Sequence, residues 1–239
     1  MNMTEFIKYF DRIYIINLEH RADRRIEIDV QLKKIKLSLD DPKVTLFNAI
    51  KPLDAGEFPS IGARGCFLSH LGILKDAKNN NFQRILVFED DLDLIDDFAN
   101  QSNLVLNDLL SSNWDIFYGD YRVNEISLSH KKNTIKVNHD LSIGTTDFIG
   151  FNGQVIDTLI DYFEAMLNRQ GGDQLGGPMH VDGAYTWFRK NHEHFSTLLT
   201  NPPLGYQRSS QSDIADPNWK NKIPFVSVIR AFLNRIKKQ

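Results

Sequence analysis

Three consecutive carboxylates, Glu89, Asp90 and Asp91, directly follow the apolar residues 85–88. An uninterrupted apolar run of this length predicts a strand buried on both faces, and ligands of open α/β sheets bind just beyond the carboxyl ends of such strands. Adjacent acids resist ionisation unless a cation lies among them, and clustered carboxylate oxygens suit hard divalent ions such as Mg²⁺ or Mn²⁺. The pattern therefore predicts a site for a metal and a phosphate-bearing ligand. The alternative is a solvated acidic turn after a strand.

Strand-like and helix-like segments alternate along the chain, and this order indicates a largely parallel sheet in one domain. The predicted fold class is α/β, with a mostly parallel central sheet flanked by helices. Glycine and proline residues between positions 51 and 65 predict a loop, and the polar residues 123–141 predict an excursion or a hairpin. The predicted strands are residues 13–18, 44–49, 85–88, 114–118 and 146–151; the predicted helices are one that follows Asp23 and residues 67–77, 96–110, 155–167 and 181–189.

The composition of the 239 residues is that of an ordinary soluble protein, with 41% hydrophobic and 25% charged residues. The net charge of −3 gives no reason to expect nucleic acid as a partner. The single cysteine, Cys66, excludes an intramolecular disulfide and fits a reducing compartment. The first ten residues lack the apolar core of a secretory signal, and no uncharged apolar run approaches the length of a membrane span. We therefore expect a cytoplasmic protein.

Four segments stand in a fixed order along the chain: Ile-Ile-Asn-Leu-Glu-His-Arg-Ala-Asp-Arg-Arg (15–25), Gly-Cys-Phe-Leu-Ser-His (65–70), Leu-Val-Phe-Glu-Asp-Asp (86–91), and Pro-Leu-Gly-Tyr-Gln (203–207) with Ser-Asp-Ile (212–214). Together they resemble glycosyltransferase family 25, which includes bacterial lipooligosaccharide galactosyltransferases and animal collagen galactosyltransferases. The resemblance extends from the first predicted strand to about residue 214. Two features depart from the family pattern: Arg64 stands where many members have an acid, and residues 123–177 contain no motif that can be aligned.

The resemblance implies a GT-A-like domain, here residues 1–224, that transfers a hexose from a UDP-sugar to a saccharide acceptor with inversion. Galactose is the first expectation for the sugar and glucose the second. The expected acceptor is lipopolysaccharide, lipooligosaccharide or another surface glycan, and the expected cofactor is Mn²⁺ or Mg²⁺. A metal held by carboxylates would neutralise the charge that develops on the departing nucleotide diphosphate.

Glu89 and Asp91 flank a single residue and form a DxD-like pair, whose side chains share a face on an extended strand. We predict Asp91 as the main metal ligand, together with Glu89. How Glu89 and Asp90 divide metal-binding, ribose-binding and supporting roles is left open.

Basic and polar residues near the first strand are candidates for donor binding. Arg21 and Arg25, with Arg24 between them in the same turn, could pair with the diphosphate, because guanidinium groups fit phosphate oxygens. Asn17 could hydrogen-bond the base or ribose. The alternative for the arginines is a solvated helical turn paired with nearby acids.

Further site residues are expected in three other segments. Ser69 and His70 are predicted to contact the donor, unless Ser69 caps a helix and His70 packs in the core. Asp182 is predicted as the general base that inversion requires, unless it is a helix N-cap. Gln207 and Asp213 are expected near the site, where they either contact the acceptor or line the site.

The C-terminal segment, residues 225–239, predicts a basic amphipathic helix. Such a helix either contacts an anionic membrane surface peripherally or packs back onto the domain. Two other functions compete with glycosyl transfer: a metal-dependent phosphohydrolase, and a family member that has lost catalysis and serves as a binding module.

Overall fold

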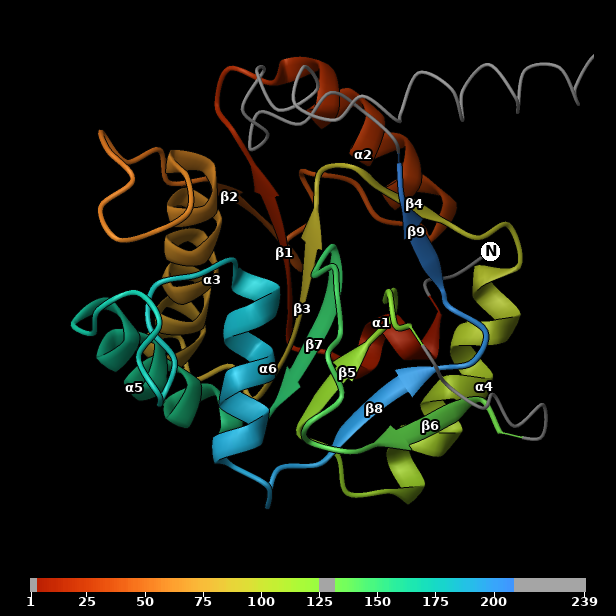
Figure 1. The fold of residues 1–239 in the computed structure, drawn as a ribbon. Coiled ribbons are helices and arrows are strands. Elements are labelled where there is room, and N and C mark those ends of the chain that lie inside the picture. The colour runs from red at the N-terminus through yellow and green to blue at the C-terminus, as the bar shows by residue number, and fades with distance from the viewer. Residues whose placement is uncertain (1–3, 125–131, 209–239) are drawn as a thin grey trace, which may run out of the picture.

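The computed structural model describes residues 4–124 and 132–208 of the chain. Its centre is a seven-stranded sheet with the order β2-β1-β3-β7-β5-β8-β6 (Figure 1). A separate two-stranded sheet pairs β4 with β9. The strands are β1 (Arg12–Asn17), β2 (Val44–Asn48), β3 (Arg84–Glu89), β4 (Leu92–Leu94), β5 (Ile116–Tyr118), β6 (Thr134–Val137), β7 (Phe148–Asn152), β8 (Thr197–Thr200) and β9 (Gly205–Gln207).

Five strands of the central sheet, β2, β1, β3, β5 and β8, run in one direction, whereas β7 and β6 run against their neighbours. The prediction of an α/β domain with a mostly parallel central sheet between helices is therefore confirmed. Because β3 lies between β1 and β7, its carboxyl end opens beside the end of one strand and the beginning of another.

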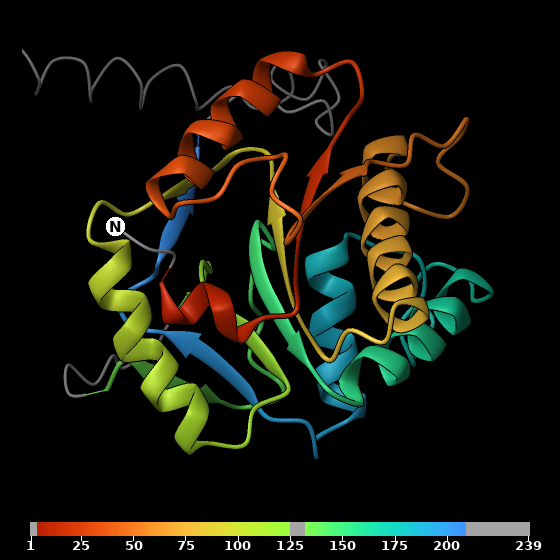
Figure 2. The ribbon, with the colours of Figure 1, turned by 180° about the vertical axis from the view of Figure 1, so that it is seen from behind.

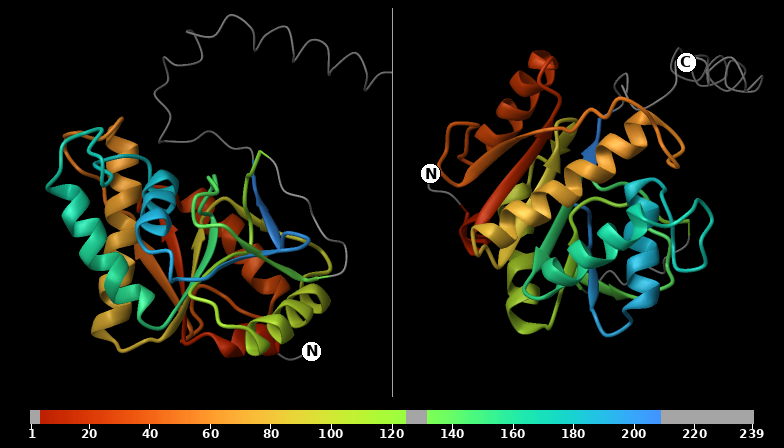
Figure 3. Two further views of the ribbon diagram at one scale, coloured as in Figure 1. Left: turned by 60° about the horizontal axis from the view of Figure 1, so that its bottom comes forward. Right: turned by 90° about the vertical axis from the view of Figure 1, so that its left-hand side faces the viewer.

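Helices cover both faces of the sheet (Figure 3). One face packs against α3, α5 and α6, and the other packs against α1, α2 and α4; Figure 2 shows α1 and α4 in front of that second face. Alternate residues of β3 enter the two cores, which is why its sequence is apolar without interruption. The helices are α1 (Glu5–Tyr9), α2 (Ala22–Lys34), α3 (Ile61–Asn79), α4 (Phe98–Ser111), α5 (Val155–Leu167) and α6 (Val181–Asn191).

Helix α3 begins six residues earlier than its sequence predicts. The Ser60 hydroxyl accepts a hydrogen bond from the Ala63 N–H at 3.0 Å and caps the helix. Gly65 lies inside the helix rather than in a turn. A Cβ atom there would be only 2.5 Å from the Ile50 carbonyl oxygen, so this position needs glycine. The predicted loop is thus wrong for residues 61–65, where glycine permits a close approach of two backbones.

Two predicted features fall on residues 209–239, which lie outside the described residues: Asp213 and the basic amphipathic helix from residue 225. The boundary of the predicted domain at residue 224 lies there too and stays a prediction. None of the helices in residues 4–124 and 132–208 is long and apolar enough to span a membrane.

Candidate active site

A cavity of about 420 Å³ lies beyond the carboxyl ends of β1 and β3, where open α/β sheets bind their ligands. The start of α2 and the first turns of α3 form its walls, and the three acids lie in it together with Gln207. Of the predicted site residues, the cavity brings together Asn17, Arg21, Ser69, Glu89, Asp90, Asp91 and Gln207.

Asp90 is neutralised by partners from β1 and α2. Arg24 Nη1 lies 2.6 Å from its Oδ1, and Asn17 Nδ2 donates to its Oδ2 at 2.7 Å. Burial raises the pKa of Asp90, and Arg24 and Asn17 oppose this shift. Both carboxylate oxygens therefore accept hydrogen bonds, so Asp90 anchors Arg24 and Asn17 at the cavity wall.

Asp91 is buried but much less well neutralised. Its Oδ2 lies 3.4 Å from Gln207 Nε2 and 3.6 Å from Arg24 Nη1, and its Oδ1 has no hydrogen-bond partner in the described part of the chain. Burial and the charge of Glu89 raise the pKa of Asp91 to about 7. A buried carboxylate oxygen without a partner is costly. The Asp91 side chain therefore fits a divalent cation, which would supply the missing positive charge.

Glu89 is held from two sides. Thr146 Oγ1 donates to its Oε1 at 2.9 Å, and His70 Nε2 lies 3.7 Å from the same oxygen. Burial acts to raise the pKa of Glu89, but His70 and Thr146 outweigh burial, and the pKa is lowered. Glu89 is thus a fixed carboxylate in the same cluster as Asp91.

The three arginines at the start of α2 have different surroundings. Arg21 lines the cavity and pairs with Asp23 at 2.9 Å, as the solvated-turn alternative expects. Arg25 Nε donates to Asn17 Oδ1 at 2.8 Å and lies outside the cavity lining. Arg24, which the sequence did not distinguish from its neighbours, is the buried one and binds the acidic cluster. The spacing in the sequence does not single it out, because Arg25, three residues before the buried Ile28, shares the same helical face.

Ser69 and His70 lie on α3 and make protein contacts. Ser69 Oγ accepts from the Ile50 N–H at 2.8 Å and donates to the Gly65 carbonyl oxygen at 2.7 Å, so it ties the cavity loop to the helix. His70 Nδ1 lies 3.0 Å from Tyr185 Oη, behind the cavity wall. The packed-core alternative describes where His70 lies, whereas Ser69 also lines the cavity.

Asp182 stands in the first turn of α6, where His180 is the N-cap residue. Its Oδ1 accepts a hydrogen bond from the Gly183 N–H at 2.8 Å, and the residue is outside the cavity lining. Its charge nevertheless reaches the site: burial raises the pKa of the Cys66 thiol well above its usual range, and the charges of Glu89 and Asp182 add to that rise. The general-base role of Asp182 stays a prediction.

Two acids that sequence reasoning missed, Asp120 and Asp147, lie on the opposite side of the cluster. Asp120 follows β5, and Asp147 precedes β7 and accepts a hydrogen bond from Thr145 Oγ1 at 2.6 Å. Burial and the charge of Asp120 raise the pKa of Asp147 to about 8. The position of Asp120 at the end of a strand was a usable signal, whereas that of Asp147 depends on the reversed direction of β7.

Gln207 connects the cluster to a further basic residue. It lies on β9, which pairs antiparallel with β4 immediately after the acids. Arg122 Nη2 donates to Gln207 Oε1 at 2.7 Å, and Gln207 Nε2 faces Asp91. The predicted proximity of Gln207 to the site agrees with this geometry.

Comparisons with known proteins agree on one family. A family model described as "Glycosyltransferase family 25 (LPS biosynthesis protein)" matches residues 10–146, more than half of the chain. Procollagen galactosyltransferase 1-A of Xenopus laevis is 32% identical over 128 residues, which are 46% of this chain and 21% of that protein. The probable inactive glycosyltransferase 25 family member 3 of Rattus norvegicus is 28% identical over 127 residues, with 46% and 22% covered.

The chain thus spans about a fifth of the length of these curated relatives. A solved structure, that of a glycosyltransferase involved in glycosylation of the major capsid of PBCV-1, aligns with 80% of this chain and 93% of its own at a TM-score of 0.40 and 11% identity. At that score the likeness adds nothing to the family match. On the family match over residues 10–146, the chain belongs to glycosyltransferase family 25.

Proposed function

We propose that the protein is a glycosyltransferase that moves a hexose from a UDP-sugar to a saccharide acceptor with inversion, using Mn²⁺ or Mg²⁺. The observation that carries the proposal is Asp91, a buried carboxylate in a cavity at the carboxyl ends of parallel strands, whose Oδ1 has no hydrogen-bond partner among residues 4–124 and 132–208. Galactose is the proposed sugar, because relatives named procollagen galactosyltransferase match the chain. A bacterial surface glycan is the proposed acceptor, because the matching family model is described as an LPS biosynthesis protein.

Asp91 and Glu89 would hold the metal, and their oxygen ligands suit Mn²⁺ and Mg²⁺. When bound, the metal supplies positive charge at the diphosphate that leaves with the nucleotide. Asp90 has another task in this scheme. It fixes Arg24 and Asn17 through hydrogen bonds of 2.6 and 2.7 Å, so these side chains are in place before a ligand arrives.

The donor diphosphate would lie against the start of α2. Arg21 lines the cavity there, and the N-terminal N–H groups of α2 carry the positive end of the helix dipole. Asn17 would contact the base or ribose from the end of β1. Arg25 would act through its hydrogen bond to Asn17, and Ser69 through the loop that it ties to α3.

Asp182 would take the proton from the acceptor hydroxyl. This role is supported by the effect of the Asp182 charge on two polar side chains next to the cluster, Cys66 and Tyr118. Burial is the main cause that raises their pKa values, and the charge of Asp182 adds to the rise. We expect Asp182→Asn to lower turnover by about 100-fold or more while leaving the donor dissociation constant within about twofold. Wild-type turnover would show that Asp182 serves only the start of α6, and a collapse of donor affinity would place it on the donor side. Asp161→Asn, on α5, is the control.

The remaining parts of the proposal concern location. The protein would act in the cytoplasm on a glycan or glycolipid acceptor, with residues 225–239 in peripheral contact with an anionic membrane surface. Flotation with anionic vesicles, for the full chain and for a chain that ends at residue 224, tests that contact.

A catalytically inactive binding module is the second candidate, because relatives named as inactive match the chain over the same length as the galactosyltransferases. Release of UDP from UDP-galactose and UDP-glucose, with Mn²⁺ and with EDTA, separates the two. We expect Mn²⁺-dependent release from one of the sugars, faster with a saccharide acceptor. Tight Mn²⁺-dependent binding of UDP without any release of UDP would support the binding module instead.

A further inference from the structure

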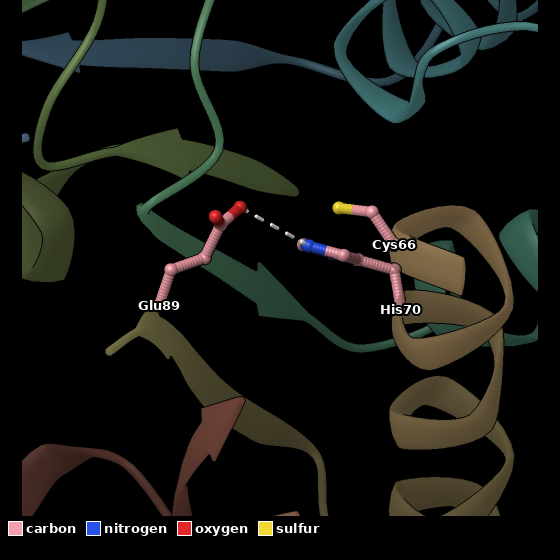
Figure 4. A group of neighbouring side chains, drawn as sticks. All are labelled: Cys66, His70 and Glu89. Atoms are coloured by element: carbon pink, nitrogen blue, oxygen red, sulfur yellow. Dashed lines mark ion pairs between the residues drawn. The ribbon is translucent and has the colours of Figure 1, made fainter. Parts of the chain in front are cut away.

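Three side chains behind the acidic cluster bring different ligand atoms together. Cys66 Sγ, a His70 ring nitrogen and a Glu89 carboxylate oxygen all lie within 4.8 Å of one another. Cys66 and His70 are four residues apart on α3 and project from one face of it, and Glu89 reaches them from the end of β3 (Figure 4). No pattern in the sequence groups these residues, because Cys66 alone predicts a packed side chain.

The spacing is close to that of a tetrahedral metal site. Ligand atoms at about 2.0–2.3 Å from Zn²⁺ lie about 3.3–3.7 Å from one another. His70 Nε2 and Glu89 Oε1 are 3.7 Å apart, which is too long for a hydrogen bond and suits two ligands of one ion. Small side-chain rotations would bring Cys66 Sγ to the same spacing.

His70 supplies an independent observation. The residue is 1% exposed, and its Nε2 has no hydrogen-bond partner within residues 4–124 and 132–208. Buried polar atoms are nearly always paired, so this nitrogen calls for an explanation. In the metal-free protein Nε2 faces Glu89 Oε1 at 3.7 Å, and a bound ion would take the place of the proton that Nε2 directs toward Glu89, while Nδ1 donates to Tyr185 Oη at 3.0 Å. Metal-bound histidines are commonly oriented by such a contact.

The charges also balance. A thiolate and a carboxylate together cancel the charge of a divalent cation, and a neutral assembly costs less to bury than any of its charged parts. Cys66 and Glu89 both line the cavity, so a fourth ligand could approach from that side.

We propose that Cys66, His70 and Glu89 form a binding site for a divalent cation of the Zn²⁺ type. The sulfur, nitrogen and oxygen donors favour such an ion over Mn²⁺ or Mg²⁺, for which the oxygens beside Asp91 are better suited. Glu89 belongs to both sets of ligands, so an ion at Cys66 competes for Glu89 with an ion at Asp91. Ion binding at Cys66 can be tested apart from the proposed transfer reaction, because it needs no nucleotide.

The test is a titration of the metal-free full chain with Co²⁺ alone, followed by absorption spectroscopy. We expect a near-ultraviolet thiolate-to-cobalt charge-transfer band and strong visible bands of tetrahedral Co²⁺, which excess Zn²⁺ removes. Cys66 is the only cysteine in the sequence, so any such charge-transfer band reports on this residue. Cys66→Ser should abolish the band, His70→Asn should weaken Co²⁺ binding by at least about tenfold, and Asp91→Asn should retain the band.

Three results would overturn the site. They are absence of the band in folded wild-type protein with Co²⁺ in excess, wild-type Co²⁺ affinity in His70→Asn, and loss of the band in Asp91→Asn. Circular dichroism checks the fold of each variant. If a variant fails to fold, the spectrum of the unmodified chain, with and without Zn²⁺, still decides whether the thiolate binds the ion.

Discussion

The two sides of the acidic cluster differ in how their carboxylates are neutralised. On the α2 side, Arg24 and Asn17 satisfy both oxygens of Asp90. On the β5–β7 side, Asp120 and Asp147 are buried near each other, and burial raises the pKa of both. Asp91 lies between these sides with one oxygen unpaired among the described residues. The carboxylate on the α2 side is therefore fully neutralised by protein groups, whereas the carboxylates on the β5–β7 side need protons or a cation.

The largest loss of stability is expected when the α2 side loses the arginine that neutralises Asp90. Arg24→Met leaves the Asp90 carboxylate buried without its cation, which typically costs about 3–5 kcal/mol of unfolding free energy. Urea denaturation at pH 7 measures this loss. Arg21→Met is the control, since its partner Asp23 is exposed, and we expect no measurable change. The double variant Arg24→Met/Asp90→Asn should recover part of the loss; equal instability of the single and double variants would contradict the pairing.

A smaller change in stability is expected on the β5–β7 side, and this change depends on pH. The pKa of Asp147 is raised from the ordinary value of 3.8 to about 8, so the folded state binds more protons than the unfolded state between these values. Stability from this group is therefore complete below about pH 4 and is lost as pH rises through about 8. Asp147→Asn removes the loss, because an amide does not ionise.

In EDTA, the stability of Asp147→Asn relative to wild type should rise by about 2 kcal/mol between pH 6 and pH 8. Thermal denaturation across this range is the measurement. Asp96→Asn, whose side chain is fully exposed, should show no such trend. A stability difference between Asp147→Asn and wild type that does not change with pH would mean that Asp147 is ionised in the folded protein.

The smallest change in stability is expected at Glu89, which lies between the α2 side and the β5–β7 side. Thr146→Val removes the hydroxyl that donates to Glu89 Oε1 at 2.9 Å but keeps the side-chain shape. Hydrogen bonds to charged groups contribute about 1.5–3 kcal/mol, and the partial solvent access of Glu89 puts the expected cost near the lower limit. Denaturant unfolding measures this change, for which Thr158→Val, on the exposed face of α5, is the control. An unchanged stability would show that Thr146 does not hold Glu89 in place.

The part of the site that the sequence predicts is the part built from local patterns, namely β3 and the acids that follow it. The apolar residues 85–88 locate β3, and the acids after it lie in the cavity as expected. These features follow from the periodicity of a single strand.

The other side depends on tertiary pairing. Asp147 reaches the cluster only because β7 runs antiparallel to β3 and β5, which no local pattern of residues 146–151 reveals. Cys66 meets Glu89 only when α3 packs beside the end of β3, and Gln207 is placed by its pairing with Leu92. Helix α3 was predicted too short, because Gly62 and Gly65 have the composition of a turn, whereas Gly65 serves the close packing of the helix against the Ile50 carbonyl oxygen.

We propose above that Asp91, whose Oδ1 is unpaired among the described residues, holds the cation that binds the nucleotide. Isothermal titration of UDP, with Mn²⁺ and with EDTA, tests it most directly in the wild type, Asp91→Asn and the exposed control Asp96→Asn. We predict that Mn²⁺ tightens UDP binding by about tenfold or more in the wild type and in Asp96→Asn, a difference of about 1.4 kcal/mol, and has no effect in folded Asp91→Asn. Undiminished Mn²⁺-dependent UDP binding by Asp91→Asn would show that Asp91 does not hold the cation.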